Sequence, residues 1–393
     1  MTQDPARPAA APDALADRVR DAVGRVSDPE LRRPLAELDM VRGVEAAGTD
    51  VRVEIALTIV GCPAADRIES DVRRAAESVD GVGAVTIDVG VMTPAQRQAL
   101  TSRLRPARGM PFGPDSLTRV IAVTSGKGGV GKSTVTANLA VALAQRGLAV
   151  GLIDADVHGF SIPPLLGLAH DGTVAQPTRV DQLMLPPVAH GVKAISIGMF
   201  LQDDGSGAGG RTGAVAWRGP MLHRTVQQFL TDVYFGDLDV LLLDMPPGTG
   251  DVAISVGQLL PHADVLVVTT PQAAASDVAV RSGLVARQTG QRVIGVVENM
   301  AAMTLPDGTL MDLFGAGGGA EVAEALSADG DTVPVLASIP LSQALRASGD
   351  AGHPVVVAHP DDPAAVALTR LAERIATQRR RLAGRLLPVA PAR

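Results

Sequence analysis

The sequence has a single cysteine, a single tryptophan and a single tyrosine, and aromatic residues make up only 2% of its 393 residues. The lone cysteine, Cys62, excludes an intrachain disulfide. No apolar run approaches the roughly 20 residues of a membrane-spanning helix, and the first residues lack the basic-then-apolar pattern of a secretory signal. We therefore expect a cytoplasmic protein whose core is filled by aliphatic side chains.

Positive charge is also scarce, because 35 Lys and Arg residues stand against 42 Asp and Glu residues and the net charge is −7. A chain with this charge is repelled by phosphate backbones, so we expect no general affinity for nucleic acid. The hydrophobic content of 46% is sufficient for a sizeable core. The length allows roughly two or three domains.

What the sequence does contain is a glycine-rich loop, S-G-K-G-G-V-G-K-S-T, at residues 125–134. The apolar run 120–123 predicts a buried strand before it, and residues 135–145 predict a helix after it. Strand, glycine loop and helix are the context of a phosphate-binding loop, where backbone N–H groups and the helix dipole hold phosphate oxygens. The expected nucleotide-binding residues are Gly126, Lys127, Gly128, Gly129, Val130, Gly131, Lys132, Ser133 and Thr134.

Two side chains of this loop have predicted roles in phosphate chemistry. Lys132 is at the position that reaches the β- and γ-phosphates of ATP, and the Ser133 hydroxyl is at the position that binds Mg²⁺. Lys127 is an additional lysine, and two ammonium groups beside the same phosphates repel each other. Lys127 therefore either reaches a nucleotide held by another subunit or is a solvated loop lysine.

The run K-G-G-V-G-K-S resembles the deviant Walker A loop of MinD/ParA/Mrp-type ATPases. In that group the first lysine crosses a nucleotide-sandwich dimer. The resemblance therefore implies a homodimer, ATP hydrolysis, and catalytic roles for Lys127 and Lys132.

Carboxylates follow two later apolar strands. The strand at 239–243 closes on Asp244, which is the Walker B pattern and predicts that Asp244 holds Mg²⁺ or its water. The strand at 149–153 leads into Asp156, which the resemblance assigns to switch I as the group that orients the attacking water. The alternative for Asp156 is an N-cap of the next turn. The resemblance also assigns Asn299 to contact the adenine base, with a helix or turn cap as the alternative.

Strands and helices alternate from residue 118 onward, which predicts an α/β fold with a mostly parallel sheet covered by helices on both faces, as in P-loop NTPases. A small α/β domain is expected before it. The boundaries that we expect are a disordered lead at 1–13, the small domain at 14–93, a linker at 94–117, the ATPase domain at 118–383 and a tail at 384–393. Residues 171–190 predict loops, and 205–213 a mobile insertion.

The small domain resembles the metal–sulfur cluster assembly domain of the SufT/PaaD type. The matching segments are 28–30, 40–41, 57–58, 61–63 and 81–82. In that family the cysteine is the candidate functional thiol, so Cys62 is a candidate iron–sulfur ligand. Cys62 precedes a predicted helix whose dipole would favour a thiolate. The alternative is a buried, unreactive cysteine.

The chain departs from the Mrp/ApbC-type iron–sulfur carriers at one point. Many of them place Cys-x-x-Cys shortly after the Asn-Met pair, whereas this chain has A-A-M-T-L-P-D-G at 301–308. Residues 304–312 predict a hairpin tip, and no thiolate can bridge a cluster there. A dimer would offer only two copies of Cys62, so external thiols or a partner must supply further ligands.

The resemblance implies an ATP-dependent iron–sulfur cluster carrier that receives clusters from assembly scaffold proteins and transfers them to apoproteins. The alternative is a MinD/ParA-like, nucleotide-gated scaffold that positions a protein partner without carrying metal. The helix from residue 363 is amphipathic and ends in basic residues, and MinD relatives use an amphipathic C-terminal helix on membranes. We expect it instead to pack on the sheet with a solvated basic end.

Overall fold

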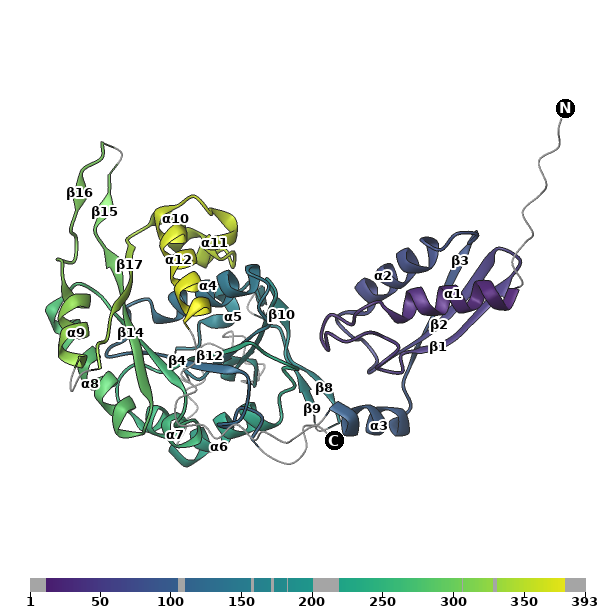
Figure 1. The fold of residues 1–393 in the computed structure, drawn as a ribbon, viewed down its shortest axis with the longest axis horizontal. Helices are drawn as coiled ribbons and strands as arrows, with labels where there is room; N and C mark the ends of the chain where they lie inside the picture. The colour runs from purple at the N-terminus through teal and green to yellow at the C-terminus, as the bar shows by residue number, and fades with distance from the viewer. Residues whose placement is uncertain are drawn as a thin grey trace, which may run out of the picture. The chain divides into compact units, whose positions relative to one another are not determined.

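The computed structural model describes residues 12–104, 110–156, 159–170, 173–181, 183–200, 219–305, 307–327 and 331–378. The expectations for the lead up to residue 11, for the insertion at 205–213 and for the tail at 384–393 lie outside these residues. The chain divides into two compact units (Figure 1). One unit contains residues 1–111, 176–188 and 228–236, and the other contains the rest.

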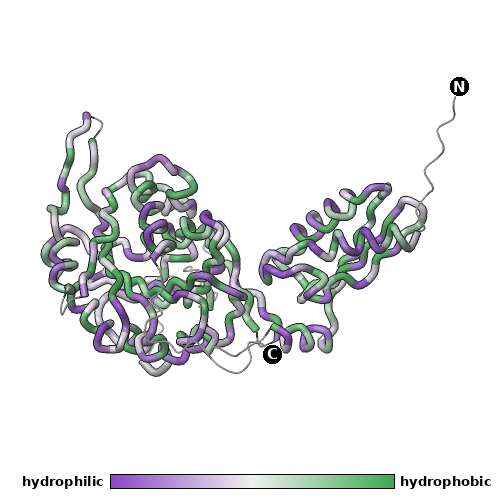
Figure 2. The backbone as a smooth tube through the Cα atoms, in the orientation of Figure 1, coloured by the Kyte–Doolittle hydropathy of each residue, from purple (hydrophilic) through white to green (hydrophobic). Residues whose placement is uncertain are grey.

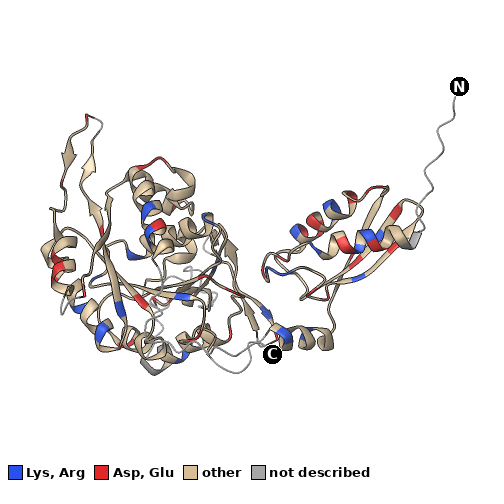
Figure 3. Cartoon of the chain, viewed as in Figure 1, with Lys and Arg blue, Asp and Glu red and all other residues tan. Residues whose placement is uncertain are grey.

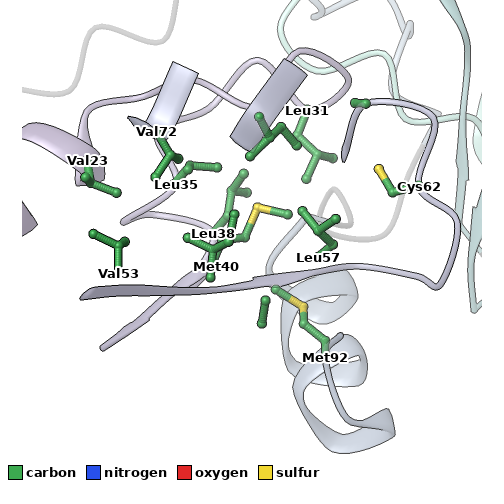
Figure 4. Packing of buried hydrophobic residues seen from close by; sticks show 14 of the residues in the cluster. Val23, Leu31, Leu35, Leu38, Met40, Val53, Leu57, Cys62, Val72 and Met92 are labelled. Carbon is green, nitrogen blue, oxygen red and sulfur yellow. The ribbon is translucent and has the colours of Figure 1, made fainter. Parts of the chain in front are cut away.

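The first unit is built on a three-stranded sheet of order β1-β2-β3. Strand β1 (Val41–Ala47) is antiparallel to β2 (Asp50–Leu57), and β3 (Val85–Val91) is parallel to β2. Helices α1 (Pro12–Gly24) and α2 (Ala65–Glu77) pack against the sheet and cover its core. Alternate residues of β2 point into this core, as Figure 4 shows for Val53 and Leu57. Acidic and basic side chains are interspersed along α1 and α2 (Figure 3).

Two expectations about this part of the chain are wrong. Residues 94–104, expected to belong to the linker at 94–117, form helix α3 (Pro94–Leu104), which buries Leu100 and Leu104 in the core of the first unit. Residues 171–190, expected to be loops, form the short strands β7 (Thr173–Val174), β8 (Thr178–Val180), β9 (Leu183–Leu185) and β10 (Val188–Ala189). Strands β8 and β9 form an antiparallel hairpin whose apolar residues also lie in that core.

The second unit contains an eight-stranded sheet of order β10-β11-β5-β12-β4-β13-β14-β17. Every pairing from β11 to β17 is parallel. The strands are β4 (Arg119–Ser125), β5 (Val150–Asp154), β11 (Val192–Ser196), β12 (Val240–Asp244), β13 (Asp264–Thr269), β14 (Arg292–Ala301) and β17 (Val335–Pro340). They are apolar along much of their length (Figure 2), as buried parallel strands are.

Helices cover both faces of this sheet, which confirms the expected fold class (Figure 1). On one face α4 (Lys132–Gln145) packs with α11 (Val355–Ala358) and α12 (Pro363–Thr377), and α10 (Gln343–Asp350) contacts α11. On the other, α8 (Ala273–Gln288) packs with α7 (Asp251–Leu259) and α9 (Gly318–Leu326). The remaining helices are α5 (Ile162–Leu165), the 3₁₀ turn η1 (Ile197–Phe200) and α6 (Gly219–Thr231).

The last helix packs on the second unit as expected. The apolar side of α12 is buried through Leu368, Leu371 and Ile375. Arg119 at the start of β4 donates to the carbonyl oxygen of Ile375 at 2.6 Å and fixes the end of the helix. The basic residues that follow, from 379 onward, lie outside the described residues. Within the described parts of the chain, no helix is both long and apolar enough to cross a membrane.

The segment after β14 is a hairpin, as predicted. Strands β15 (Met303–Thr304) and β16 (Leu310–Met311) are antiparallel and project from the sheet (Figure 1). Leu310 and Leu313 are exposed on it.

Candidate functional site

The glycine loop joins the end of β4 to the start of α4, and two of its glycines are required for different reasons. Gly131 is the N-cap of α4 and has a φ of 80°, in the left-handed region where a Cβ is strained. Gly126 lies against the backbone of Val278 in α8, and any Cβ at that position would overlap it. The path of the loop therefore requires glycine at both positions.

A cavity of about 690 Å³ lies against this loop. This volume is in the range of pockets that hold nucleotides and other small ligands. Apart from Gly126, every nucleotide-binding residue predicted in the loop lines it, and so does Asp156. The remaining lining residues come from the end of β4, the β5–α5 connection, α5, the turn after β12 and the end of α10; they are Ser125, Gly159, Ser161, Pro164, Leu165, Pro246, Pro247, Gly349 and Asp350.

Asp244 is the centre of the charged network beside the loop. It is fully buried at the end of β12, and its Oδ2 lies 2.8 Å from Lys132 Nζ. The Ser133 hydroxyl donates to the same oxygen at 2.6 Å, and the Thr136 hydroxyl donates to Oδ1 at 2.9 Å. The structure thus brings together Lys132, Ser133 and Asp244, the three residues for which the sequence predicts contacts with phosphate and Mg²⁺.

Asp156 lies beside the same lysine, with its Oδ2 3.9 Å from Lys132 Nζ. Its Oδ1 accepts a hydrogen bond from the Gly159 backbone at 3.1 Å, so it also caps a local turn. The N-cap of helix α5 is Ser161, so Asp156 does not cap that helix. Because Asp156 lines the cavity, it can act on a ligand there as well as hold the turn.

Lys127 extends along the surface of its own protomer. Its Nζ donates to the Gln272 side-chain oxygen at 3.0 Å, at an exposed position. Gln272 is the N-cap of α8, where its own side chain caps no helix N–H. This contact holds the ammonium group at the edge of the cavity.

Asn299 supports the loop from behind. It lies in β14 and not at a helix or turn start, and its Nδ2 donates to the Val130 carbonyl oxygen at 2.9 Å. Its side chain also fills the space that a Cβ on Gly131 would need. The structure therefore gives Asn299 a role in holding the loop, and contact with adenine stays a prediction.

Sequence reasoning missed three residues of this site. Thr136 binds Asp244, and Asp154 accepts a hydrogen bond from the Ser196 hydroxyl at 2.9 Å. Burial, and then the charge of Asp244, raise the pKa of Asp154 to about 8. The Asp-Ala-Asp spacing at 154–156 was a signal for Asp154, whereas nothing in the local sequence singled out Ser196.

The comparisons with known proteins agree with this geometry. The family described as "NUBPL iron-transfer P-loop NTPase" matches residues 116–376, and the family described as "Iron-sulfur cluster assembly protein" matches residues 16–89. The chain belongs to the NUBPL-type P-loop NTPase family. The "Iron-sulfur cluster carrier protein" of Mycobacterium tuberculosis H37Rv is 55% identical over 384 residues, which cover 95% of this chain and 97% of that protein.

A more distant relative and a solved structure are also similar to this chain. The Bacillus subtilis "Iron-sulfur cluster carrier protein" is 38% identical over 335 residues, or 83% of this chain and 88% of that protein. A nucleotide-binding protein from Archaeoglobus fulgidus, solved in complex with ADP, is 36% identical. The match between the two structures covers 60% of this chain and 86% of the Archaeoglobus fulgidus protein, with a TM-score of 0.48.

In this family member the candidate thiol is buried within the first unit. Cys62 is 7% exposed and packs near Leu31 and Leu57 (Figure 4). Burial, together with the negative charges of Glu30 and Asp28, raises the pKa of the Cys62 thiol to about 11. The expectation that the dipole of α2 favours a thiolate is therefore wrong, because loss of solvation outweighs the helix end.

The surroundings of Cys62 include a segment from the later part of the chain. Glu30 accepts a hydrogen bond from the Thr178 hydroxyl at 3.1 Å, and Thr178 begins strand β8. Among the residues that the structure describes, no three His, Cys, Asp or Glu side chains are grouped to hold a metal ion.

Proposed function

We propose that this protein is an iron–sulfur cluster carrier that binds and hydrolyses ATP as a nucleotide-dependent homodimer and transfers clusters to apoproteins. The observation that carries the proposal is the buried Asp244 carboxylate, which joins Lys132 and Ser133 beside a glycine loop at 2.8 Å and 2.6 Å. The cargo is inferred from the relatives, which are named as iron–sulfur cluster carriers and match this chain over nearly their whole length.

The chain's own groups fit a bound nucleoside triphosphate. The loop presents backbone that only glycine permits, and its helix α4 begins at the cavity with a positive dipole end. Lys132 is only 6% exposed, and in the protein alone it neutralises Asp244. When nucleotide binds, the Lys132 ammonium group pairs with the phosphates in place of Asp244. The Asp244 carboxylate then becomes available to a cation.

The donor set at Asp244 also fits Mg²⁺. A serine hydroxyl and a carboxylate are hard oxygen ligands, and Mg²⁺ in such sites takes one or two protein ligands besides phosphate and water. Ser133 and Asp244 would hold the ion, which supplies charge neutralisation at the β- and γ-phosphates. Asp156 then orients the attacking water from the cavity wall.

Lys127 links the nucleotide to dimer formation. Among the residues that the structure describes, the Lys127 ammonium group of one protomer is paired with the neutral Gln272 oxygen, at the exposed edge of the cavity. A triphosphate held by the facing protomer offers it a much stronger partner. ATP binding thus favours the closed pair, and hydrolysis removes the charge that holds it together.

The cluster is the cargo, and Cys62 is the candidate ligand for it. The free thiol is protonated and buried, so cluster binding must uncover Cys62 and displace its proton, as soft metals do with thiols. One thiol per protomer leaves further ligands to a second protomer, a partner or small thiols.

Anaerobic reconstitution with iron and sulfide tests the carrier function. The wild type is expected to take up iron and sulfide and to pass the cluster to an apo-ferredoxin, whereas Cys62→Ser loses uptake. The control Lys132→Ala should keep the cluster but lose ATP hydrolysis, because Lys132 acts at the other site.

One observation favours a second function, the nucleotide-gated scaffold that carries no metal. This observation is the buried thiol with a raised pKa, which is a poor ligand in the free protein. If the wild type hydrolyses ATP but takes up no iron under any reconstitution condition, the scaffold replaces the carrier.

A further inference from the structure

Three residues lie abreast at the ends of adjacent parallel strands in the second unit. Ser196 of β11 is in register with Asp154 of β5, and Asp154 is in register with Asp244 of β12. Residues in register on parallel strands point to the same face of the sheet. All three are fully buried, so their polar groups must bind one another or nearby backbone.

Asp154 closes the loop that carries Asp156. One carboxyl oxygen accepts from the backbone N–H of Asp156 at 3.2 Å, and the other accepts from that of Ile162 at 3.3 Å. These two donors lie at either end of the connection between β5 and α5. A single buried carboxyl group therefore anchors both ends of this connection.

Ser196 in turn fixes Asp154. Its hydroxyl donates to Asp154 Oδ2 at 2.9 Å and accepts from the Gly198 backbone at 3.1 Å. The hydroxyl thus ties the carboxyl group to the neighbouring strand and to the 3₁₀ turn η1. Rotation of the Asp154 side chain would break its bond to Ser196 on β11 and its bonds to the backbone of Asp156 and Ile162.

The cavity wall depends on this closure. Asp156, Gly159 and Ser161 line the cavity, and all three lie between the two backbone groups that Asp154 holds. Asp154 itself is buried behind them. Displacement of a catalytic group by about 1 Å can lower a rate about 100-fold, so the loop path matters to any group that orients water.

We propose that Asp154 is a positioning residue for ATP hydrolysis, which holds Asp156 at the cavity wall and is itself fixed by Ser196. This proposal rests on the ATPase function proposed above. It assigns Asp154 no contact with nucleotide or metal, and it predicts that nucleotide binding, which the glycine loop performs, survives when Asp154 is changed.

The test uses the full chain with Asp154→Asn, which keeps the shape but exchanges one acceptor oxygen for a donor. We expect kcat for ATP to fall about 10- to 100-fold. The Kd for a non-hydrolysable ATP analogue with Mg²⁺ should change by less than about threefold, because the glycine loop is intact. Without nucleotide, amide hydrogen exchange of residues 155–162 should accelerate.

Ser196→Ala is the second variant, and it leaves the carboxyl group in place. It should lower kcat in the same direction by a smaller factor, again with nucleotide binding retained. Ser282→Ala is the matched control, because it removes another buried hydroxyl. The Ser282 hydroxyl is paired with that of Thr124 at a distance of 2.8 Å, away from this connection. The control should keep the wild-type kcat.

Several results would overturn the proposal. Wild-type kcat in Asp154→Asn or Ser196→Ala would show that the loop path does not govern hydrolysis. If Asp154→Asn lowers kcat, nucleotide affinity and melting temperature together, Asp154 only supports the fold. A wild-type protein that binds ATP but does not hydrolyse it would refute the ATPase function, and the positioning role with it.

Discussion

At the scale of single residues, the site is governed by partners that each charged group has in the protein alone. Lys132 is paired with a buried carboxylate, Lys127 with a neutral amide, and Cys62 with apolar side chains. Each pairing sets how readily the group is released to a ligand. A buried ion pair exchanges only for another charged partner, whereas a surface hydrogen bond is easily replaced.

Gln272 is expected to restrain dimer formation. Gln272→Ala removes the exposed acceptor of Lys127, a bond of about 1 kcal/mol. The ammonium group is then freer to reach a facing nucleotide, so the dimer's dissociation constant with ATP and Mg²⁺ should fall about fivefold. Sedimentation velocity measures this constant. The control is Gln98→Ala, at an exposed position. An unchanged or weaker dimer in Gln272→Ala would contradict the proposal that Gln272 restrains dimer formation.

Cys62 is expected to react slowly at neutral pH. Its pKa in the folded protein is raised from 9.0 to about 11, so the thiolate appears in the folded chain only as the pH approaches 11. Because the unfolded chain ionises first, this group's contribution to stability is complete below pH 9 and is lost as the pH rises towards 11.

The rate of iodoacetamide alkylation across this pH range, followed by mass spectrometry, checks the raised pKa. In urea, which unfolds the chain, the pH at which the alkylation rate is half-maximal should shift back to the ordinary pKa of a thiol. A folded protein that alkylates fully at pH 7 would show that the thiol is exposed and ionised.

At the scale of elements, the hairpin β8–β9 lies in the sequence range that matches the P-loop NTPase family, but it packs in the first unit. Val180, Leu183 and Leu185 lie in the core that contains Cys62, and Thr178 binds Glu30. Tyr234, from the segment at residues 228–236, lies in the same core. The first unit therefore depends on parts of the chain that are distant in sequence.

The hairpin is expected to stabilise the first unit. Leu183→Ala removes a side chain that is 4% exposed, which typically costs about 2–5 kcal/mol of unfolding free energy. Amide exchange in β2 should become faster, while exchange in β4 and β12 stays the same. Arg179→Ala, at an exposed position of the same hairpin, is the control. Equal exchange in β2 of Leu183→Ala and the wild type would contradict a structural role for the hairpin.

At the scale of the whole molecule, the proposed cycle depends on two protomers joined by nucleotide. The cavity lies at the carboxyl edge of the parallel sheet, and Lys127 is at its exposed edge. Ligands bind at this edge in open α/β sheets. A second protomer that approaches there would meet both the nucleotide and the lysine.

ATP with Mg²⁺ is expected to convert the monomer to a dimer, most completely in Asp156→Ala, which keeps the nucleotide intact. Lys127→Ala should still bind the nucleotide but remain monomeric, since only the contact across the pair is lost. Light scattering after size exclusion, with nucleotide in the buffer, measures both. A wild-type protein that stays monomeric with bound ATP and Mg²⁺ at high concentration would refute the cycle.

The sequence alone was sufficient for features that depend on short spacings. The glycine loop, Lys132, Ser133 and Asp244 were predicted because each motif is a local pattern tied to one strand end or one helix start. The α/β class followed from alternating apolar strands and helices, and the hairpin at 303–311 from a turn signal. These features are local, so their residues are neighbours in the chain.

Only the tertiary structure decided what depends on burial and on contacts between distant segments. Ser196 meets Asp154 across 42 positions, and Thr136 meets Asp244 across 108. Helix α3 and the β8–β9 hairpin gained their order from a core formed by other segments. The pKa of Cys62 rose for the same reason, because the loss of water around a thiol is set by the packed fold and not by the helix that follows it.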